Sequence, residues 1–239
     1  MLCRGGAADI LWRAMGHSLP HTFRGLEKNR LEALIDGVFA VALTLLVLDI
    51  KLPDNIASAS NAALWGRLLE LERHFVIYVI SFAVIGVYWI NQHIQFHYVS
   101  RTNRKLIWIN LLYLLLISFL PFATDLIGDH KDLVLPCEIY GLALLALSGV
   151  SHGHLEYLAR HPALASSELT PAVVSVIRRR ILVFTLVPLL SMGLAFTSTH
   201  LALYAYVLLL AAHVFPGRVD EQISTTSPAA VQPDDTLSA

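Results

Sequence analysis

Long apolar stretches follow one another along the chain, separated by short segments rich in charged and polar residues. The stretches exceed the roughly four to eight residues of a buried strand and do not alternate between apolar and polar positions, which predicts helices. A bilayer core about 30 Å thick requires about 20 apolar residues in a helix. We therefore predict an all-α membrane protein with six transmembrane helices, at residues 31–52, 75–99, 106–127, 133–157, 181–199 and 201–215.

Less apolar segments flank this membrane region at both ends. Residues 1–29 are mixed and basic and are expected to form a cytoplasmic N-terminal tail. Residues 218–239 are polar and contain proline, a composition typical of disorder. Residues 30–217 remain as one six-helix transmembrane domain, whose last two stretches meet at a short turn near His200 and predict a helical hairpin.

The composition agrees with a membrane protein and narrows the function. Of 239 residues, 56% are hydrophobic and 15% are charged, whereas a soluble domain is about half apolar and a quarter charged. A net charge of −1 without a basic face argues against nucleic acid as a partner. The two cysteines have no metal-ligand spacing, so we expect no metal site, no disulfide framework and no cofactor.

The distribution of Lys and Arg predicts the orientation in the membrane. Thirteen of these residues lie on the side of the two termini, and only four lie on the other side. Both termini are therefore expected in the cytoplasm, in a multi-pass protein of the cell membrane. The opposite side carries acidic residues that would mildly concentrate cations, namely Asp54, Glu70, Glu72, Asp125, Asp129 and Asp132.

Charged side chains inside a span are costly and are therefore candidates for function. Arg30 and Asp36 lie about 240° apart around a helix, so they are not expected to pair with each other. Trp89 and His93 lie at the same cytoplasmic end and predict a structural network with Arg30 and Asp36. Two alternatives stay open: the polar groups are solvated at the interface, or Asp36 and His93 form a proton-handling site.

An uncharged stripe runs along the second half of the first span. Val41, Leu45 and Leu48 are spaced i, i+4, i+7 and share one helix face, with Thr44 beside them. Such spacing occurs in any apolar helix, and a threonine such as Thr44 can bond the backbone carbonyl of Ala40. The spacing alone therefore favours packing over a pore-lining role.

Signatures of several protein classes are absent from the sequence. It contains no Walker motif, no Gly-rich dinucleotide loop, no HExxH and no GxSxG, so we do not expect an enzyme. It also lacks a TVGYG-type filter, an Arg-rich voltage-sensing span and a pair of helices broken by Gly or Pro. His152 and His154 lie two residues apart, on different helix faces, which argues against a metal site.

The segment RLEALIDGVFAVALTLLVLDIKLP, residues 30–53, resembles the first helix of the transmembrane-protein-175-type potassium channels of lysosomes and prokaryotic membranes. The family pattern is R-x-x-x-F-S-D followed by a run close to GxFAIAxTLLVL, and Arg30, Asp36 and residues 37–48 match it. The segments VIGVYWINQHIQFH and ISFLPFAT resemble the family's tryptophan–histidine and phenylalanine–proline segments. The likeness covers the first four spans and reaches the last two only through hydropathy.

The resemblance implies a leak-type potassium-permeable channel that favours K⁺ over Na⁺. A single six-span repeat implies a homotetramer in the lipid bilayer, with the first helix lining a central pore. Val41, Leu45 and Leu48 would form its hydrophobic constriction, with Thr44 as the polar neighbour tied to selectivity. The residues that hold the helices together in the family correspond here to Arg30, Asp36, Trp89 and His93.

Three departures from the family pattern bear on the mechanism. Leu34 and Ile35 replace the Phe-Ser pair, which removes a hydroxyl from the network. Gln92 stands where the family often has a second His. Val41 is smaller than the usual Ile or Leu, so the constriction is expected to be wider or differently hydrated.

Other functions remain compatible with the sequence. A proton-coupled secondary transporter that uses Asp36 and His93 would give saturable flux driven by a pH gradient. A proton leak through the same pore is a variant of this alternative. A non-conducting scaffold would give no flux at all.

Overall fold

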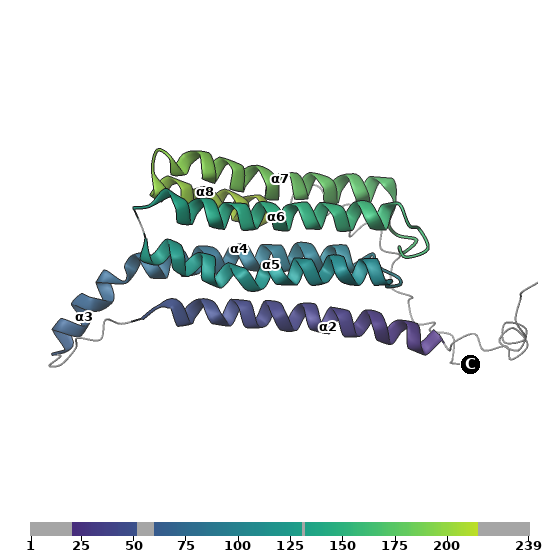
Figure 1. Ribbon diagram of the computed structural model, residues 1–239, viewed down its shortest axis with the longest axis horizontal. Coiled ribbons are helices and arrows are strands. Elements are labelled where there is room, and N and C mark those ends of the chain that lie inside the picture. Colours follow the sequence, from purple (N-terminus) through teal and green to yellow (C-terminus); the bar gives the residue numbers. More distant parts are fainter. Residues whose placement is uncertain (1–20, 52–59, 131, 215–239) are drawn as a thin grey trace, which may run out of the picture.

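The computed structural model describes residues 21–51, 60–130 and 132–214. This part of the chain is helical, and its only β pairing is one isolated bridge between Val99 and Ala165. The long helices run side by side in an up-and-down bundle (Figure 1). The elements are α2 (His21–Leu45), the 3₁₀ helix η1 (Leu46–Asp49), α3 (Asn61–Glu70), α4 (Glu72–His97), α5 (Arg104–Asp129), α6 (Val134–Ala159), α7 (Pro171–Ala195) and α8 (Thr199–Val214).

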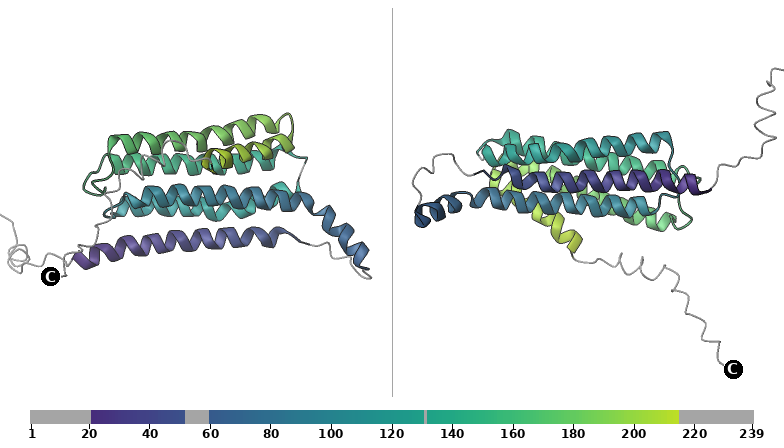
Figure 2. Two further views of the ribbon diagram at one scale, coloured as in Figure 1. Left: turned by 180° about the vertical axis from the view of Figure 1, so that it is seen from behind. Right: turned by 90° about the horizontal axis from the view of Figure 1, so that it is seen from below.

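The order of the helices across the bundle places α2 at one edge. α2 packs against α4 and α5, α5 packs against α6, and α7 packs against α6 and α8. Figures 1 and 2 show α2 along one side of the α4–α5 pair, with α6 and α7 on the other side. Much of the surface of α2 is therefore left uncovered by the other described helices.

Four helical segments are long and apolar enough to cross a bilayer, in agreement with the first four predicted spans: Lys28–Leu48, Glu72–His97, Arg104–Asp129 and Val134–Ala159. Among the described residues, α7 and α8 do not meet that measure, because α7 carries three consecutive arginines and α8 has only 16 residues.

Two helices begin earlier than the sequence predicted. α7 begins at Pro171 rather than at residue 181. α2 begins at His21, within the segment expected as an N-terminal tail. The expected C-terminal tail, most of the N-terminal tail and Asp54 lie outside the described residues.

A short helix that the hydrophobic pattern did not predict lies between α2 and α4. α3 points away from the bundle (Figures 1 and 2), and its Trp65 side chain is 64% exposed. Leu64 and Leu68, and likewise Trp65 and Leu69, are four residues apart and therefore share one side of the helix. This spacing indicates a helix, but a segment of ten residues is too short to be found in a search for membrane-spanning runs.

Aromatic side chains connect the helices in the centre of the bundle. The ring centroids of Tyr88 on α4 and Phe184 on α7 lie 4.6 Å apart. The Tyr88 hydroxyl donates to the carbonyl of Leu144 at 3.1 Å, and the Tyr113 hydroxyl donates to the carbonyl of Tyr88 at 3.2 Å. Each of these phenols thus has a protein partner, which is required where no bulk water can replace it.

Two loops at one end of the bundle bind each other through their backbones. The Ser100 N–H donates to the carbonyl of Leu164, and the Ser166 N–H donates to the carbonyl of Tyr98, both at 2.8 Å. The Asn103 side chain accepts a hydrogen bond in the first turn of α5 and so caps that helix. These contacts fix the end of the bundle at which α4 leads into α5 and α6 leads into α7.

Candidate functional site

α2 has one buried and one exposed face. Only 28% of its span is buried inside the described structure, against 44% for both α4 and α5 and 50% for α6. The Phe39 ring packs toward α5, 6.2 Å from the ring of Tyr113 between centroids. The residues of the buried face are three or four apart in sequence, as one helix face requires: Leu31, Ile35, Phe39, Ala42 and Leu46.

The residues predicted to form a constriction lie together on the exposed face of α2. Val41 is 56% exposed, Leu45 is 41% exposed and Leu48 is 63% exposed. The Thr44 hydroxyl lies beside them and donates to the carbonyl of Val41 at 2.9 Å, rather than to that of Ala40, the other carbonyl considered for it. The hydroxyl oxygen keeps lone pairs that can accept a further partner.

The last turn of this span is 3₁₀ helical, although the sequence predicted an α-helix as far as residue 52. η1 takes up Leu46–Asp49. Residues three apart lie almost in line along the axis of a 3₁₀ helix, which favours alignment of Leu48 with Leu45. The same turn directs Leu46 into the bundle, where it is 1% exposed. A short segment thus presents one leucine to the core and another to the outside.

Three of the four predicted network residues meet near one end of the bundle. The Trp89 indole N–H on α4 donates a 2.9 Å hydrogen bond to the Asp36 carboxylate on α2. The His93 ring stacks on the Trp89 ring, with centroids 5.6 Å apart and 29° between the planes. The hydrogen bond ties the edge helix α2 to α4. All three side chains are exposed in the single chain, so the group lies at the surface of the bundle.

Arg30 does not join this group. Its side chain is exposed and forms no hydrogen bond or ion pair with any residue that the structure describes. Its position about 240° around the helix from Asp36 accounts for the separation. Among the described cations of α2, Lys28 contacts α4, with its ammonium group 5.9 Å from the centroid of the Phe96 ring.

A buried polar cluster between α4 and α6 was not predicted from the sequence. Gln95 and Asn91 both donate to the Ser151 hydroxyl oxygen, at 2.5 Å and 3.0 Å. The Nδ1 atom of His154 lies 3.0 Å from the Oε1 atom of Gln95. All four side chains are at most 3% exposed. The sequence does contain one indication of this cluster. The two residues of α4 are four apart and the two of α6 are three apart, so each pair lies on one face of its helix.

Gln92 connects α4 to α5. Its side-chain amide donates to the Oδ1 atom of Asn110 at 2.7 Å, and Asn110 donates in turn to the carbonyl of Leu106 at 2.8 Å. Neither amide titrates, so this position holds two helices together without adding a pH-dependent charge. A histidine here would bring such a charge into a buried place.

The described residues contain no cluster that suits a metal ion, since their His, Cys, Asp and Glu side chains nowhere gather in a group of three or more. His152 is exposed, and its Nε2 atom lies 4.0 Å from the Glu156 carboxylate. His154 is buried in the cluster described above. The two histidines lie on different faces of α6, as their spacing predicts.

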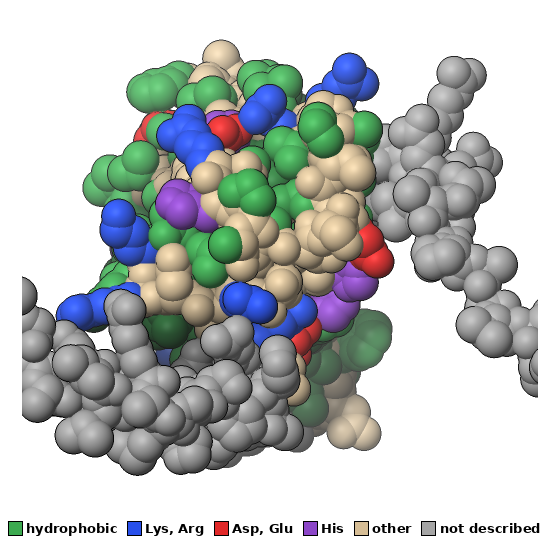
Figure 3. All heavy atoms as spheres, turned by 90° about the vertical axis from the view of Figure 1, so that its right-hand side faces the viewer, with side chains coloured by type: hydrophobic (Ala, Val, Ile, Leu, Met, Phe, Trp, Pro, Cys, Tyr) green, Lys and Arg blue, Asp and Glu red, His purple; other side chains and the backbone are tan. Residues whose placement is uncertain are grey.

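The two ends of the bundle differ in charge. Figure 3 shows the end at which α2 begins, with Lys and Arg side chains spread around it. The described cations of this end are Lys28, Arg30, Arg101, Arg104, Lys105, Arg160, Arg178, Arg179 and Arg180. In the described part of the opposite end, Lys51 and Arg73 are outnumbered by acidic residues: Glu70, Glu72, Asp125, Asp129 and Asp132.

Comparison with known proteins identifies the family. Residues 30–121, from α2 to within α5, match the model of a family described as the endosomal/lysosomal potassium channel TMEM175. A potassium channel of Streptomyces collinus is 34% identical over 187 residues, which cover 77% of this chain and 89% of that relative. The chain belongs to the TMEM175 family. The family is one of channels, not of enzymes, and the resemblance found in the sequence is confirmed.

The TMEM175 likeness extends to the fold. The crystal structure of a lysosomal potassium-selective channel TMEM175 homolog from Chamaesiphon minutus superposes with a TM-score of 0.67 at 30% identity, over 79% of this chain and 96% of that one. The endosomal/lysosomal proton channel TMEM175 of Gallus gallus is 36% identical over 112 residues, which cover 45% of this chain but only 22% of that relative. This chain is therefore a membrane protein with the helical fold of a TMEM175 channel.

Proposed function

We propose that the protein is a leak-type potassium-permeable channel in which α2 lines a central pore. The observation that carries this proposal is the exposed apolar stripe Val41, Leu45 and Leu48 on a helix that is only 28% buried in its own chain. A span at the edge of a bundle needs lipid or other protein against its free face. In a homotetramer, four copies of this face would enclose the pore.

The constriction is proposed to be apolar. Four copies each of Leu45 and Leu48, with Val41 one turn further along, would narrow the passage, and hydrophobic constrictions gate by dewetting. The oxygen of Thr44 keeps lone pairs that can help a partly dehydrated cation. Because water is removed from Na⁺ at greater cost than from K⁺, the expected preference is K⁺ over Na⁺.

The proposed orientation places the basic end in the cytoplasm of a cell-membrane protein, following the positive-inside rule. All six long helices would then cross the bilayer, α7 with its three arginines at the cytoplasmic boundary, and both termini would be cytoplasmic. Residues 30–217 would form the channel domain between tails at 1–29 and 218–239. The acidic residues of the opposite end would concentrate cations at the outer mouth.

The hydrogen-bonded pair Asp36 and Trp89, together with His93, is proposed to be a structural clasp that holds the pore helix against α4. The 2.9 Å bond and the stacked rings support this role. Arg30, which has no partner in the described part of its own chain, is proposed to complete the clasp in the assembled tetramer.

A second candidate function is a proton leak or proton-coupled transport that uses Asp36 and His93. It is favoured by the vertebrate relatives that are named proton channels, and by the contact of both Asp36 and His93 with the indole of Trp89. Proton translocation predicts flux driven by a pH gradient in the absence of K⁺.

Planar-bilayer recording of the purified protein in bi-ionic K⁺/Na⁺ solutions tests the proposal. A channel gives unitary currents, and a reversal potential displaced toward that of K⁺ supports the proposed preference. Saturable flux that follows a pH gradient without unitary currents would instead support the transporter. The absence of K⁺ flux into vesicles that contain the protein, above that of empty vesicles and at any pH, would contradict the channel, and the absence of pH-driven flux as well would contradict the transporter.

A further inference from the structure

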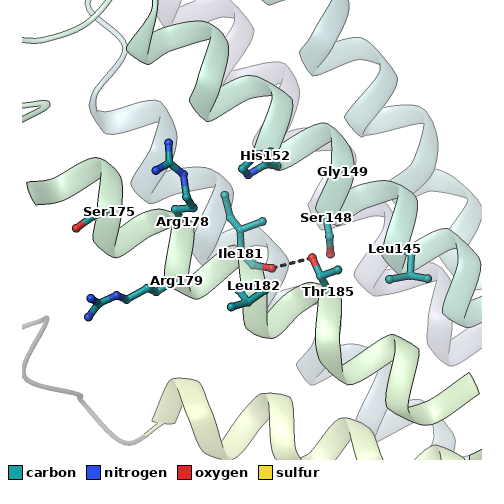
Figure 4. Close-up of a pocket in the computed structure, with 10 residues that line it drawn as sticks. All are labelled: Leu145, Ser148, Gly149, His152, Ser175, Arg178, Arg179, Ile181, Leu182 and Thr185. Atoms are coloured by element: carbon teal, nitrogen blue, oxygen red, sulfur yellow. Dashed lines mark hydrogen bonds between the residues drawn. The ribbon is translucent and has the colours of Figure 1, made fainter. Parts of the chain in front are cut away.

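A groove runs between α6 and α7 on the side of the bundle away from α2. Its volume is about 660 Å³, within the range of about 300–1,000 Å³ that is usual for small-molecule sites. Figure 4 shows His152, Arg178 and Arg179 at one end of the groove, and Leu145 and Thr185 toward the other end.

The groove is basic at one end, where two arginines share one carboxylate and a third arginine has no acidic partner among the described residues. Arg178 binds the Oε1 atom of Glu156 through two of its nitrogens. The Arg160 guanidinium lies 3.7 Å from the same carboxylate. Arg179 lines the groove and forms no ion pair within the described residues. The end of the groove therefore carries excess positive charge, which suits an anion.

The rest of the groove is apolar in its chemistry, although two hydroxyls line it. The Ser148 hydroxyl donates to the carbonyl of Phe184 at 2.7 Å, and the Thr185 hydroxyl donates to that of Ile181 at 3.1 Å (Figure 4). Gly149 widens the groove, since a Cβ atom added there would meet nothing within 4 Å. From Arg178 to Thr185 the groove extends about 10 Å along α7, at about 1.5 Å per residue.

We propose that this groove binds one anionic phospholipid, with its phosphate at Arg178, Arg179 and His152 and one acyl chain beside Gly149. A lipid combines the two chemistries that the groove offers, a negative head and an apolar tail. The groove lies on α6, a candidate span, and opens at the basic end of the bundle. Anionic lipids are concentrated in the cytoplasmic leaflet, where such basic pockets between helices bind lipid head groups.

A second copy of the chain is a poorer occupant of the groove. Covering Arg179 with an apolar protein face would remove its charge from water without supplying an anion, which is costly. The inference depends on the bundle being embedded in a bilayer. It does not depend on which ion the protein conducts, so its failure and that of the proposed function are separable.

Lipid photo-crosslinking to the full-length protein in detergent micelles tests the proposal. The probes are phosphatidylglycerol and phosphatidylcholine, each with a photoreactive group in one acyl chain, and the crosslinked peptides are identified by mass spectrometry. Phosphatidylglycerol is expected to label α6 and α7 more strongly than phosphatidylcholine does. Arg179→Gln is expected to lower the affinity for phosphatidylglycerol about fivefold, the effect of one cation near an anionic membrane surface.

Matched variants separate a specific site from general attraction. Arg104→Gln removes an exposed cation from the same end of the bundle, outside the groove, and is expected to leave the affinity unchanged. Gly149→Leu is expected to abolish labelling of α6 and α7 by both lipids, whereas Gly193→Leu, at another exposed glycine with open space, is expected to preserve it. Equal losses in Arg104→Gln and Arg179→Gln, labelling confined to other helices, or crosslinks between protomers through the groove would each overturn the proposal.

Discussion

Leu48 and Leu46 are two residues apart on η1 and have opposite surroundings. Leu48→Ala is expected to widen the proposed constriction, so that K⁺ current rises or the preference for K⁺ over Na⁺ weakens. It should scarcely change the stability of the protomer, because the side chain is 63% exposed and leaves no cavity. Bi-ionic bilayer recording measures the first effect, and thermal unfolding in detergent measures the second.

Leu46→Ala is the matched control for this prediction. Leu46 is 1% exposed, so truncation opens a cavity and is expected to lower the free energy of unfolding by about 2–5 kcal/mol. The ion preference of the folded fraction should stay unchanged. If Leu46→Ala alters the ion preference and Leu48→Ala does not, the proposed pore face of α2 is wrong.

The bond between Asp36 and Trp89 can be measured as a coupling energy. Trp89→Phe removes the indole N–H and keeps a ring to stack on His93, and Asp36→Asn removes the charge that the N–H binds. A double-mutant cycle is expected to give a coupling of about 1 kcal/mol, below the usual value for bonds to charged groups because both side chains are exposed. Trp108→Phe, at an exposed tryptophan on α5, should show no coupling with Asp36→Asn. A coupling of zero for the Trp89 cycle would mean that the bond does not hold α2 in place.

The pairing of Asp36 with Trp89 could be anticipated at the residue scale because both residues lie at the same end of two neighbouring spans. The bond from Thr44 to Val41 rather than to Ala40 could not, since both carbonyls are within reach of a helical threonine. His154 was missed because the sequence presents it beside His152. Its hydrogen-bond partner is Gln95 on α4, 59 positions away in the chain.

At the scale of elements, the buried cluster between α4 and α6 gives the clearest prediction. Ser151→Ala leaves both Asn91 and Gln95 without their acceptor and is expected to cost about 1–3 kcal/mol of stability. Ser118→Ala is the control, because Ser118 is exposed on α5 and bonds only its own helix, at the carbonyl of Leu115. Denaturant or thermal unfolding in micelles distinguishes them. Equal stability of the two variants would show that the cluster does not join α4 to α6.

Hydrophobic runs predicted the long helices well and the other elements less well. A membrane span is easy to recognise in a sequence because the thickness of the bilayer requires about 20 apolar residues in a row. α3 lacks that length, and its signal is only a four-residue periodicity. The start of α7 was placed at residue 181, where the apolar run begins, although Thr170 followed by Pro171 is a recognisable cap and first turn. The residue types of η1 do not distinguish a 3₁₀ turn from an α-helical one, so its form could not be predicted.

At the scale of the whole molecule, the asymmetry of charge was predictable because it depends only on which loops hold Lys and Arg. The assembly was not predictable from composition, since no count of residues says which helix lies at the edge of the bundle. The packing of α2 on α4 and α5 alone supplies that information. It shows that the stripe beginning at Val41 lies on an exposed helix face, which must be covered by lipid or by other protein.

Arg30 is where the proposed assembly can be tested most directly. It is exposed and lacks a partner among the described residues, and within that part of the chain Asp36 accepts a hydrogen bond at one of its two carboxylate oxygens. If Arg30 completes the clasp across the interface, Arg30→Ala should weaken the tetramer and leave the unfolding of the protomer unchanged. Native mass spectrometry over a dilution series measures the first quantity, and thermal unfolding measures the second.

The control is Arg104→Ala, because Arg104 is also an exposed cation at the basic end without an ion pair among the described residues. Arg30→Ala should dissociate at a higher protein concentration than both the unaltered protein and Arg104→Ala. A conservative Arg30→Lys change keeps the charge but loses the planar fork of donors, so it should restore the tetramer only in part. Dissociation of Arg30→Ala at the same concentration as the unaltered protein would place the subunit contact elsewhere, and an unaltered protein that is monomeric throughout would exclude the tetrameric pore.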